Sequence, residues 1–350
     1  MNKRLSKFAY VENNYGISSL TQLKDIWRLW RTNSLLPNEY FDFSLFSYDI
    51  NARRNFIGLV ESNKIWSRYN VKPSIEKYIN NKWKFYHKFV DLPIPETGLL
   101  QRETINDQIK EIYEISRHTN VFMKPVAGWG GKGCFVITNK MDFNAVTGCL
   151  LRNYSAGYIY QRALKPHHEM DKFTYSGAIG ALRVITLVRQ PDKIEIVGAF
   201  TKFVGQGNIV DYTSNPGNYL VGVYPHFWSL TEAMTNNGVN SKRFNEMNGY
   251  SIYGTNIPVG EDFDSELCRW VSEVHNKLEL DTSLIGWDIA VTNEGVYCLE
   301  ANLKPGFASL QKADGKGYLH VFNPQRVLST DYTPIKSFAK KGLTTAWKTR

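Results

Sequence analysis

The chain has 350 residues, of which 43% are hydrophobic and 14% aromatic. This length allows two or three domains with sizeable cores, and the aromatic content excludes a disordered chain. The formal net charge of +9 favours polyanionic partners such as nucleotides or acidic sugars, and it is compatible with a transient contact with an anionic membrane surface. No nucleic-acid-binding motif accompanies this charge, so we expect no nucleic acid partner.

Targeting signals and cysteines indicate the compartment. The N-terminus is basic but is not followed by an apolar segment, which predicts no signal peptide, and no apolar run is long enough for a membrane helix. The four cysteines are far apart and form no CxxC pair: Cys134, Cys149, Cys268 and Cys298. Such spacing is typical of reduced thiols, so we expect a cytoplasmic protein.

Residues 1–75 show helical periodicity. Apolar residues at intervals of three and four predict an amphipathic helix with one stripe: Leu20, Leu23, Ile26, Trp27 and Trp30. Residues 37–50 are rich in aromatics, which either pack in a core or form a sugar-binding surface, and packing is the more common use. Two further helices are expected, one at 80–97 that ends in a proline-containing loop and one at 103–118.

Short strands and glycine-rich turns follow Val121. The strands are expected at 121–125, 133–138, 158–164, 182–189, 195–203, 285–292 and 296–302. A helix at about 262–280 carries an apolar face of Leu267, Trp270, Val271, Val274 and Leu278. Strands interleaved with helices predict an α+β or α/β fold.

The segment 284–306 carries the most informative polar residues. Asn293-Glu294-Gly295 predicts a three-residue hairpin loop, and pairing of Thr292 with Val296 would place Asp288 opposite Glu300. Because side chains alternate along a strand, Asn302 shares the face of Glu300. The other face collects the apolar residues Trp287, Ile289, Val291, Tyr297 and Leu299.

Two carboxylates this close need a cation, a proton or an arginine. At about 5 Å they repel by roughly 3 kcal/mol at an effective dielectric of about 20. Mg²⁺ prefers such hard oxygen ligands and commonly uses one or two carboxylates with substrate phosphates. The sequence therefore predicts a magnesium site of Asp288, Glu300 and Asn302, against the alternative of an ordinary hairpin with acids facing water.

Four glycines lie between the first two expected strands: Gly128, Gly130, Gly131 and Gly133. Glycine permits positive φ angles and a close approach of backbone N–H groups to phosphate oxygens. The pattern is neither a Walker A motif nor a dinucleotide fingerprint. Lys124, on the strand that leads into the loop, is placed to put its ammonium against a phosphate.

In combination these motifs resemble the ATP-grasp superfamily. Their order is Lys-Pro, a glycine-rich loop, YIYQRAL, ALRVITLV, GWDIAV and CLEANLKPG, and the chain looks most like the sugar-transfer-associated branch over about residues 80–310. The resemblance implies an α+β, ATP-grasp fold, in which two α/β subdomains grip ATP. Together with the helical periodicity of residues 1–75, it predicts a helical, aromatic-rich N-terminal segment at 1–75, a pre-ATP-grasp region at 76–118, an ATP-grasp catalytic domain at 119–330 and a basic C-terminal tail at 331–350.

The resemblance also implies the nucleotide contacts. Lys82 would be the first phosphate-binding lysine, with Lys84 as the alternative, and Lys124 would contact the α-phosphate and the adenine edge. The hinge that pairs with adenine would be Gln161, Arg162, Ala163 and Leu164. His168 or Glu169 would reach the ribose; a metal pair of His167 and His168 is less favoured, because adjacent residues point in different directions.

The remaining implied roles concern the acceptor. Arg183 and Lys202 would face the γ-phosphate and the acceptor, and residues 205–218 would form a cover over the site. The implied cofactors are ATP and Mg²⁺, and the implied reaction joins a carboxylate to an amine through an acyl phosphate. The substrate would be a small-molecule or lipid-linked sugar acid or amino acid in bacterial surface polysaccharide synthesis. A phosphotransferase acting on a sugar hydroxyl and a non-catalytic ATP-binding partner of glycan assembly are the alternatives.

Overall fold

The computed structural model describes residues 3–324 except 129, 154–156, 176, 191–192 and 209–216. The expected tail at 331–350 and most of the expected cover at 205–218 therefore lie outside the described residues. The chain divides into two compact units, neither of which is continuous in sequence. The first comprises Met1–Arg68, Met234–Phe244 and Gly306–Arg350, and the second Tyr69–Ala233 and Asn245–Pro305. The boundaries expected from the sequence after residues 75, 118 and 330 stay predictions.

The first unit is mainly helical, as the sequence predicts. Its helices are α1 (Lys3–Tyr15), α2 (Ser19–Asn33), α3 (Pro37–Asp42), α4 (Ile50–Arg54), α5 (Leu59–Tyr69), α12 (Phe307–Asp314) and α13 (Leu319–Phe322), with 3₁₀ turns at Leu45–Ser47 and Gly238–Asn240 and the short strand β9 (Arg243–Phe244). Its core includes the buried side chains of Tyr40, Phe41, Phe43 and Phe46. Packing is thus the use of these aromatic residues between 37 and 50.

Helix α2 differs from its prediction. Ser18 caps it by accepting a hydrogen bond from the Thr21 N–H, and Ser34 ends it in a left-handed conformation. Its buried residues are Gln22, Ile26, Leu29 and Asn33. The expected single stripe is wrong, because only Ile26 of its five members is buried and the other four are exposed.

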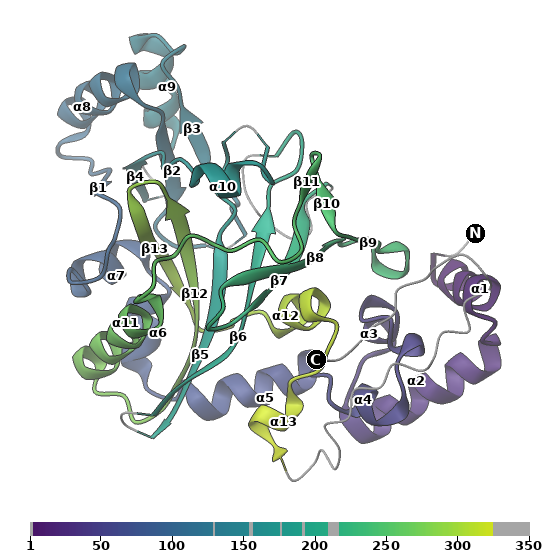
Figure 1. Cartoon of the computed structure of the whole chain (residues 1–350). Helices are drawn as coiled ribbons and strands as arrows, with labels where there is room; N and C mark the ends of the chain where they lie inside the picture. The colour runs from purple at the N-terminus through teal and green to yellow at the C-terminus, as the bar shows by residue number, and fades with distance from the viewer. Residues whose placement is uncertain are drawn as a thin grey trace. The chain divides into compact units, whose positions relative to one another are not determined.

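The second unit begins with a small sheet covered by helices (Figure 1). Its strands lie in the order β1-β4-β2-β3, with β1 at Thr97–Leu99, β2 at Val121–Pro125, β3 at Phe135–Ile137 and β4 at Tyr158–Arg162. The helices that precede and connect these strands are α6 (Pro73–Ile79), α7 (Lys82–Lys88), α8 (Ile105–His118) and α9 (Phe143–Asn153). Buried residues of α8 and α9, such as Ile112 and Leu150, pack against Val121 and Met123 of β2.

The large antiparallel sheet of the second unit contains the strands in the order β13-β12-β5-β6-β7-β8. Their bounds are β5 (Leu182–Gln190), β6 (Lys193–Phe203), β7 (Tyr219–Tyr224), β8 (Ser229–Thr235), β12 (Ser283–Thr292) and β13 (Gly295–Asn302). Each residue of β12 is buried, as expected of a strand inside a sheet. Strands β5, β6, β12 and β13 confirm the sequence prediction, whereas β1, β7 and β8 were not predicted.

The remaining elements of the second unit are α10 (His168–Asp171), β10 (Glu246–Met247), β11 (Tyr250–Ser251) and α11 (Phe263–Leu278). The predicted face of α11 is confirmed, since Leu267, Trp270, Val271, Val274 and Leu278 are all buried. The four cysteines form no disulfide. Among the described residues, no helix is both long and apolar enough to cross a membrane.

Candidate functional site

Three neighbouring strands place three charged residues in one row. Asp288 of β12 pairs in register with Arg183 of β5 on one side and with Glu300 of β13 on the other. Directly opposite residues of an antiparallel pair project from the same face. The expected opposition of Asp288 and Glu300 is therefore confirmed, and an arginine stands on the other side of Asp288.

The register that produces this row differs from the predicted one. Thr292 pairs with Gly295 instead of Val296, so the hairpin has a two-residue connection at Asn293-Glu294. A one-residue shift would move Glu300 away from Asp288, but an irregularity between Asp288 and Ile289 restores the opposition. As a second consequence, Leu299 lines a cavity beside Asp288 instead of lying on the apolar face.

Arg183 binds both oxygens of the Asp288 carboxylate. The guanidinium Nε donates to Oδ1 at 2.5 Å and an Nη donates to Oδ2 at 2.7 Å, while the other Nη donates to the Pro305 carbonyl at 3.1 Å. Burial opposes ionisation of Asp288, but Arg183 and the ammonium of Lys202 outweigh it and hold the pKa of Asp288 below its usual range. The two cations therefore favour the ionised form of Asp288.

Glu300 also has a cationic partner. The Lys82 ammonium lies 3.0 Å from Oε2 of Glu300 and donates to the Gly128 carbonyl at 3.0 Å. The side-chain nitrogen of Asn302 lies 3.2 Å from Glu300 and 3.4 Å from Asp288. Rotating this amide by a half-turn would present its oxygen to the same point, so Asn302 can act as a donor to the carboxylates or as a metal ligand.

Lys124 is buried and held by a tyrosine. Its ammonium donates to the Tyr86 hydroxyl at 2.8 Å and lies 5.3 Å from the centre of the same ring. The Tyr86 hydroxyl in turn donates to the Leu299 carbonyl at 2.5 Å. Burial lowers the pKa of Lys124, although the nearby Glu300 opposes this effect. Tyr86 thus joins helix α7, strand β2 and strand β13 at the site.

The glycine-rich loop between β2 and β3 has the backbone that its sequence predicts. Gly128, Gly130, Gly131 and Gly133 all have φ angles between +68° and +130°. L-residues rarely adopt this conformation, so glycine is required here. A Cβ at Gly133 would also lie 3.0 Å from the Tyr158 hydroxyl.

A cavity of about 440 Å³ brings most of these groups together. This volume is in the usual range for a small-molecule site. Ten predicted site residues line it: Lys82, Lys124, Gly130, Gly131, Gln161, Arg162, Ala163, Leu164, Asp288 and Glu300. Lys84, the alternative to Lys82, does not line the cavity and is exposed.

The expected hinge comprises the last two residues of strand β4 and the two residues that follow it. The Gln161 side chain is buried and donates to the Thr97 hydroxyl at 2.5 Å. The Ala163 N–H donates to the Asn120 carbonyl at 2.8 Å, so this donor is already occupied. A ligand would therefore use other backbone groups of the segment, such as those of Leu164.

Six predicted site residues do not line the cavity. Arg183 and Asn302 contact Asp288, Lys202 is buried on β6, and Gly133 belongs to the glycine loop. His168 contacts Asn293 through its ring at 2.9 Å, and Glu169 binds Lys172 at 2.7 Å. The ribose contact of His168 or Glu169 stays a prediction that nothing in this geometry favours.

Sequence reasoning missed two residues that shape the site. Tyr86 gave no motif signal, because its role depends on contacts with two distant strands. Gly286 pairs with Asn302, and a Cβ there would lie 2.9 Å from Pro305 and 3.1 Å from the Arg183 side chain. The glycine before Trp287 thus leaves room for Arg183 to reach Asp288.

The charges around the site suit a metal-bound anion. Four cationic side chains, Lys82, Lys124, Arg183 and Lys202, surround the two carboxylates, so the site has an excess of positive charge. Each carboxylate oxygen has more than one lone pair, so Asp288 can keep Arg183 and still bind a cation. Two carboxylates and an amide oxygen fit Mg²⁺ that also binds phosphate oxygens. No cluster of three or more His, Cys, Asp or Glu side chains suited to a metal occurs in the described residues.

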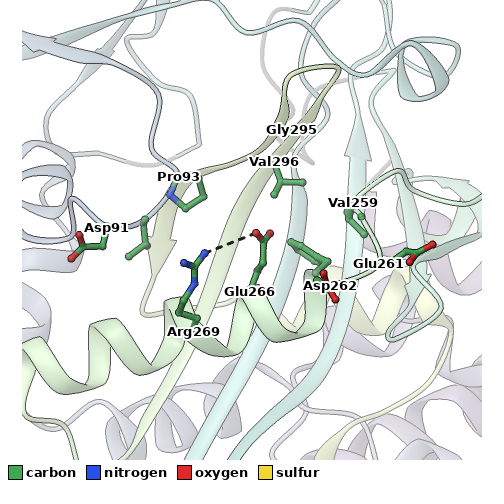
Figure 2. Close-up of a pocket in the computed structure, with 12 residues that line it drawn as sticks. Asp91, Pro93, Val259, Glu261, Asp262, Glu266, Arg269, Gly295 and Val296 are labelled. Carbon is green, nitrogen blue, oxygen red and sulfur yellow. Dashed lines mark ion pairs between the residues drawn. The ribbon is translucent and has the colours of Figure 1, made fainter.

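A second hollow, of about 500 Å³, lies near the start of α11 (Figure 2). Carboxylates predominate among its charged side chains: Asp91, Glu261, Asp262 and Glu266, with Arg269 at 3.9 Å from Glu266. No predicted site residue lines it. Acidic side chains repel phosphate, so the cavity beside Asp288 is the better candidate for an anionic ligand.

The chain resembles known proteins in sequence and in fold. A family profile described as sugar-transfer associated ATP-grasp matches residues 61–325. D-alanyl-alanine synthetase A from Vibrio cholerae O1 biovar eltor has a TM-score of 0.45 and 15% identity over 73% of this chain and 66% of its own. VanG D-Ala:D-Ser ligase from Enterococcus faecalis has a TM-score of 0.43 and 15% identity over 70% of this chain and 60% of its own.

A third solved structure, the ligase PsnB complexed with minimal precursor, Mg and ADP, has a TM-score of 0.41 and 15% identity over 74% of this chain and 62% of its own. This chain spans about two thirds or less of the length of each of these structures. No curated protein sequence matches it.

Proposed function

Because the chain belongs to the sugar-transfer-associated ATP-grasp family and has the α+β, ATP-grasp fold, we propose that it is an ATP- and Mg²⁺-dependent ligase that joins a carboxylate to an amine. The observation that carries this proposal is the row of Arg183, Asp288 and Glu300 beside the lysines and glycine loop of the same cavity. The family is described as sugar-transfer associated, which supports a role in sugar metabolism. We propose that the substrate is a sugar acid or an amino acid used in the synthesis of bacterial surface polysaccharide. A cytoplasmic location stays a prediction.

Each residue has a definite task in this proposal. Asp288, Glu300 and Asn302 would hold Mg²⁺, which when bound neutralises phosphate charge and orients the transferred phosphoryl group. Lys82 and Lys124 supply fixed positive charge, and the positive-φ glycines allow backbone N–H groups to approach phosphate oxygens. Residues Gln161–Leu164, which line the cavity, would bind the adenine ring of ATP.

The geometry refines the role proposed for Arg183. Because its guanidinium binds both oxygens of Asp288, its first effect is to keep that carboxylate ionised and correctly oriented. Contact with the acyl phosphate would require Arg183 to exchange part of this pair for the ligand. A positioning role therefore accounts for the contacts that Arg183 makes.

The reaction type is tested by trapping the activated acyl group. The chain is incubated with Mg-ATP, a panel of uronic acids and amino acids, and hydroxylamine in place of the natural amine. A ligase gives a hydroxamate together with ADP. A stable sugar phosphate that hydroxylamine does not attack would replace this proposal by a phosphotransferase, and no ADP with any acceptor would favour a binding protein.

The metal assignment is tested with matched variants of one hairpin. Glu300→Gln should lower magnesium-dependent ADP release by roughly a hundredfold or more, because a metal ligand is lost. Glu294→Gln, at the exposed tip of the hairpin, should leave it unchanged. We expect no gain in stability from Glu300→Gln, since the change also removes the ion pair with Lys82. Wild-type turnover in the Glu300 variant would contradict the metal site.

A further inference from the structure

Helix α2 of the first unit has an apolar face that the described residues of this unit leave exposed. Its core-facing residues are Gln22, Ile26, Leu29 and Asn33. A different set of large apolar side chains is exposed: Leu20 by 63%, Leu23 by 53%, Trp27 by 60% and Trp30 by 53%. With 3.6 residues per turn, these four side chains lie within about 80° of one another around the helix. They form one continuous stripe, which we call the exposed stripe.

The side of α2 next to the exposed stripe is basic. Lys24, Arg28 and Arg31 are exposed and follow the stripe within about 80° around the helix. The Arg31 guanidinium lies 5.4 Å from the centre of the Trp27 ring, so the two surfaces are in contact. The one acidic residue of the helix, Asp25, is turned away and bound to Arg53 at 2.6 Å.

This arrangement matches the chemistry of a membrane interface. Tryptophan is enriched at the level of lipid headgroups, leucine enters the acyl region, and lysine and arginine attract anionic lipids. A solvent-facing helix would carry both signs of charge, whereas α2 exposes three cations and no acid. A second copy of the chain would offer the same cations and carries the same net charge of +9.

We propose that α2 is an interfacial helix, which lies flat on an anionic lipid bilayer with Leu20, Leu23, Trp27 and Trp30 inserted and Lys24, Arg28 and Arg31 at the headgroups. Fifteen residues give a helix about 22 Å long, all of it parallel to the surface. The inserted side chains reach about 5–10 Å into the boundary between headgroups and acyl chains. The binding is independent of ATP and of catalysis.

The test is vesicle flotation of the whole chain. We expect it to float with vesicles of phosphatidylcholine mixed with phosphatidylglycerol, much less with phosphatidylcholine alone, and less at high salt. Trp27→Ala with Trp30→Ala should weaken binding at least about tenfold. Lys24→Gln, Arg28→Gln and Arg31→Gln should each cost about fivefold, and together about a hundredfold.

Matched controls come from the second unit. Phe227→Ala removes an aromatic side chain that is 81% exposed, and Lys110→Gln with Arg117→Gln removes two exposed cations of α8. Neither should change flotation. The proposal is overturned if the chain does not float with the anionic vesicles, or if the control and α2 variants lose binding equally. It is also overturned if sedimentation without lipid shows a dimer that the Trp27 and Trp30 changes dissociate.

Discussion

Both carboxylates of the candidate site face cations from distant parts of the chain. Asp288 is bound by Arg183, 105 positions away, and Glu300 by Lys82. Isolated buried charges are costly, and a buried pair is stable mainly while both partners remain. The cations therefore have two tasks, which are to keep the acids ionised before a metal binds and to attract the anionic ligand.

The buried pair predicts a strong coupling between two substitutions. Arg183→Leu should destabilise the second unit by about 3–5 kcal/mol, because it leaves Asp288 without its main partner. Adding Asp288→Asn should recover a large part of this loss, while turnover stays absent in both variants. Urea unfolding of the two single variants and the double variant measures the coupling. Additive losses would show that the pair has no direct role in stability.

Tyr86 offers a test of positioning as opposed to folding. Tyr86→Phe removes the hydroxyl that accepts from Lys124 and donates to the Leu299 carbonyl. We expect Mg-ATP affinity to fall about two- to tenfold, the value of one hydrogen bond. The control is Tyr160→Phe, which removes from strand β4 a hydroxyl that donates to Glu111 of α8. Calorimetric titration should give a normal affinity for the control, and an equal loss in both variants would contradict the role of Tyr86.

Two kinds of local backbone geometry shape the site. The irregularity in the β12–β13 pairing keeps Asp288 opposite Glu300 despite the short hairpin connection. The glycine loop keeps four left-handed or related conformations in a short stretch between β2 and β3. Both features determine the directions in which neighbouring groups point.

Replacing a glycine by alanine should change stability differently in the glycine loop and in helix α9. Gly133→Ala should cost about 1–2 kcal/mol in stability, because φ is +79° and the new Cβ would meet Tyr158 and Pro125. It should also weaken Mg-ATP binding, since the loop must shift. Gly148→Ala, in the middle of α9, would place its Cβ 3.5 Å from the flexible end of Arg152, and it should be neutral or stabilise by up to about 1 kcal/mol. Thermal midpoints of both variants, with and without Mg-ATP, test this order, and a silent Gly133 change would contradict it.

The chain contains two compact units, and the candidate site lies in one of them. The first holds a helical, aromatic core, and the second holds every residue of the candidate site. A ligand that binds one folded unit stabilises that unit by mass action. The two units should therefore respond differently to the same ligand.

Calorimetry of the whole chain should resolve this difference. Mg-ATP at about a hundred times its Kd should stabilise the second unit by about 2.7 kcal/mol, and removal of the metal with EDTA should reverse most of the shift. Leu29→Ala, in the core of the first unit, should lower the other transition and leave the ligand-dependent one unchanged. One transition that shifts as a whole with both changes would show that the units unfold together.

Local patterns in the sequence were enough to predict most helices and strands and the two carboxylates of the candidate site, Asp288 and Glu300. The bounds of β2, the buried face of α11 and the strand positions of Asp288 and Glu300 follow from periodicity, glycine and alternation, which act over a few residues. The opposition of the two acids was predicted from a pairing of Thr292 with Val296 that proved wrong, because a strand irregularity cannot be recognised from alternation alone.

Tertiary structure decided which partner each charge meets and which helix face is covered. Arg183 reaches Asp288, and Tyr86 reaches both Lys124 and β13, only because strands and helices distant in sequence pack together. Helix α2 carries apolar residues on two of its faces, and the periodicity of the sequence does not show which face packs into the core. Packing of Ile26 and Leu29 into the first unit settles it, and leaves Trp27 and Trp30 in solvent.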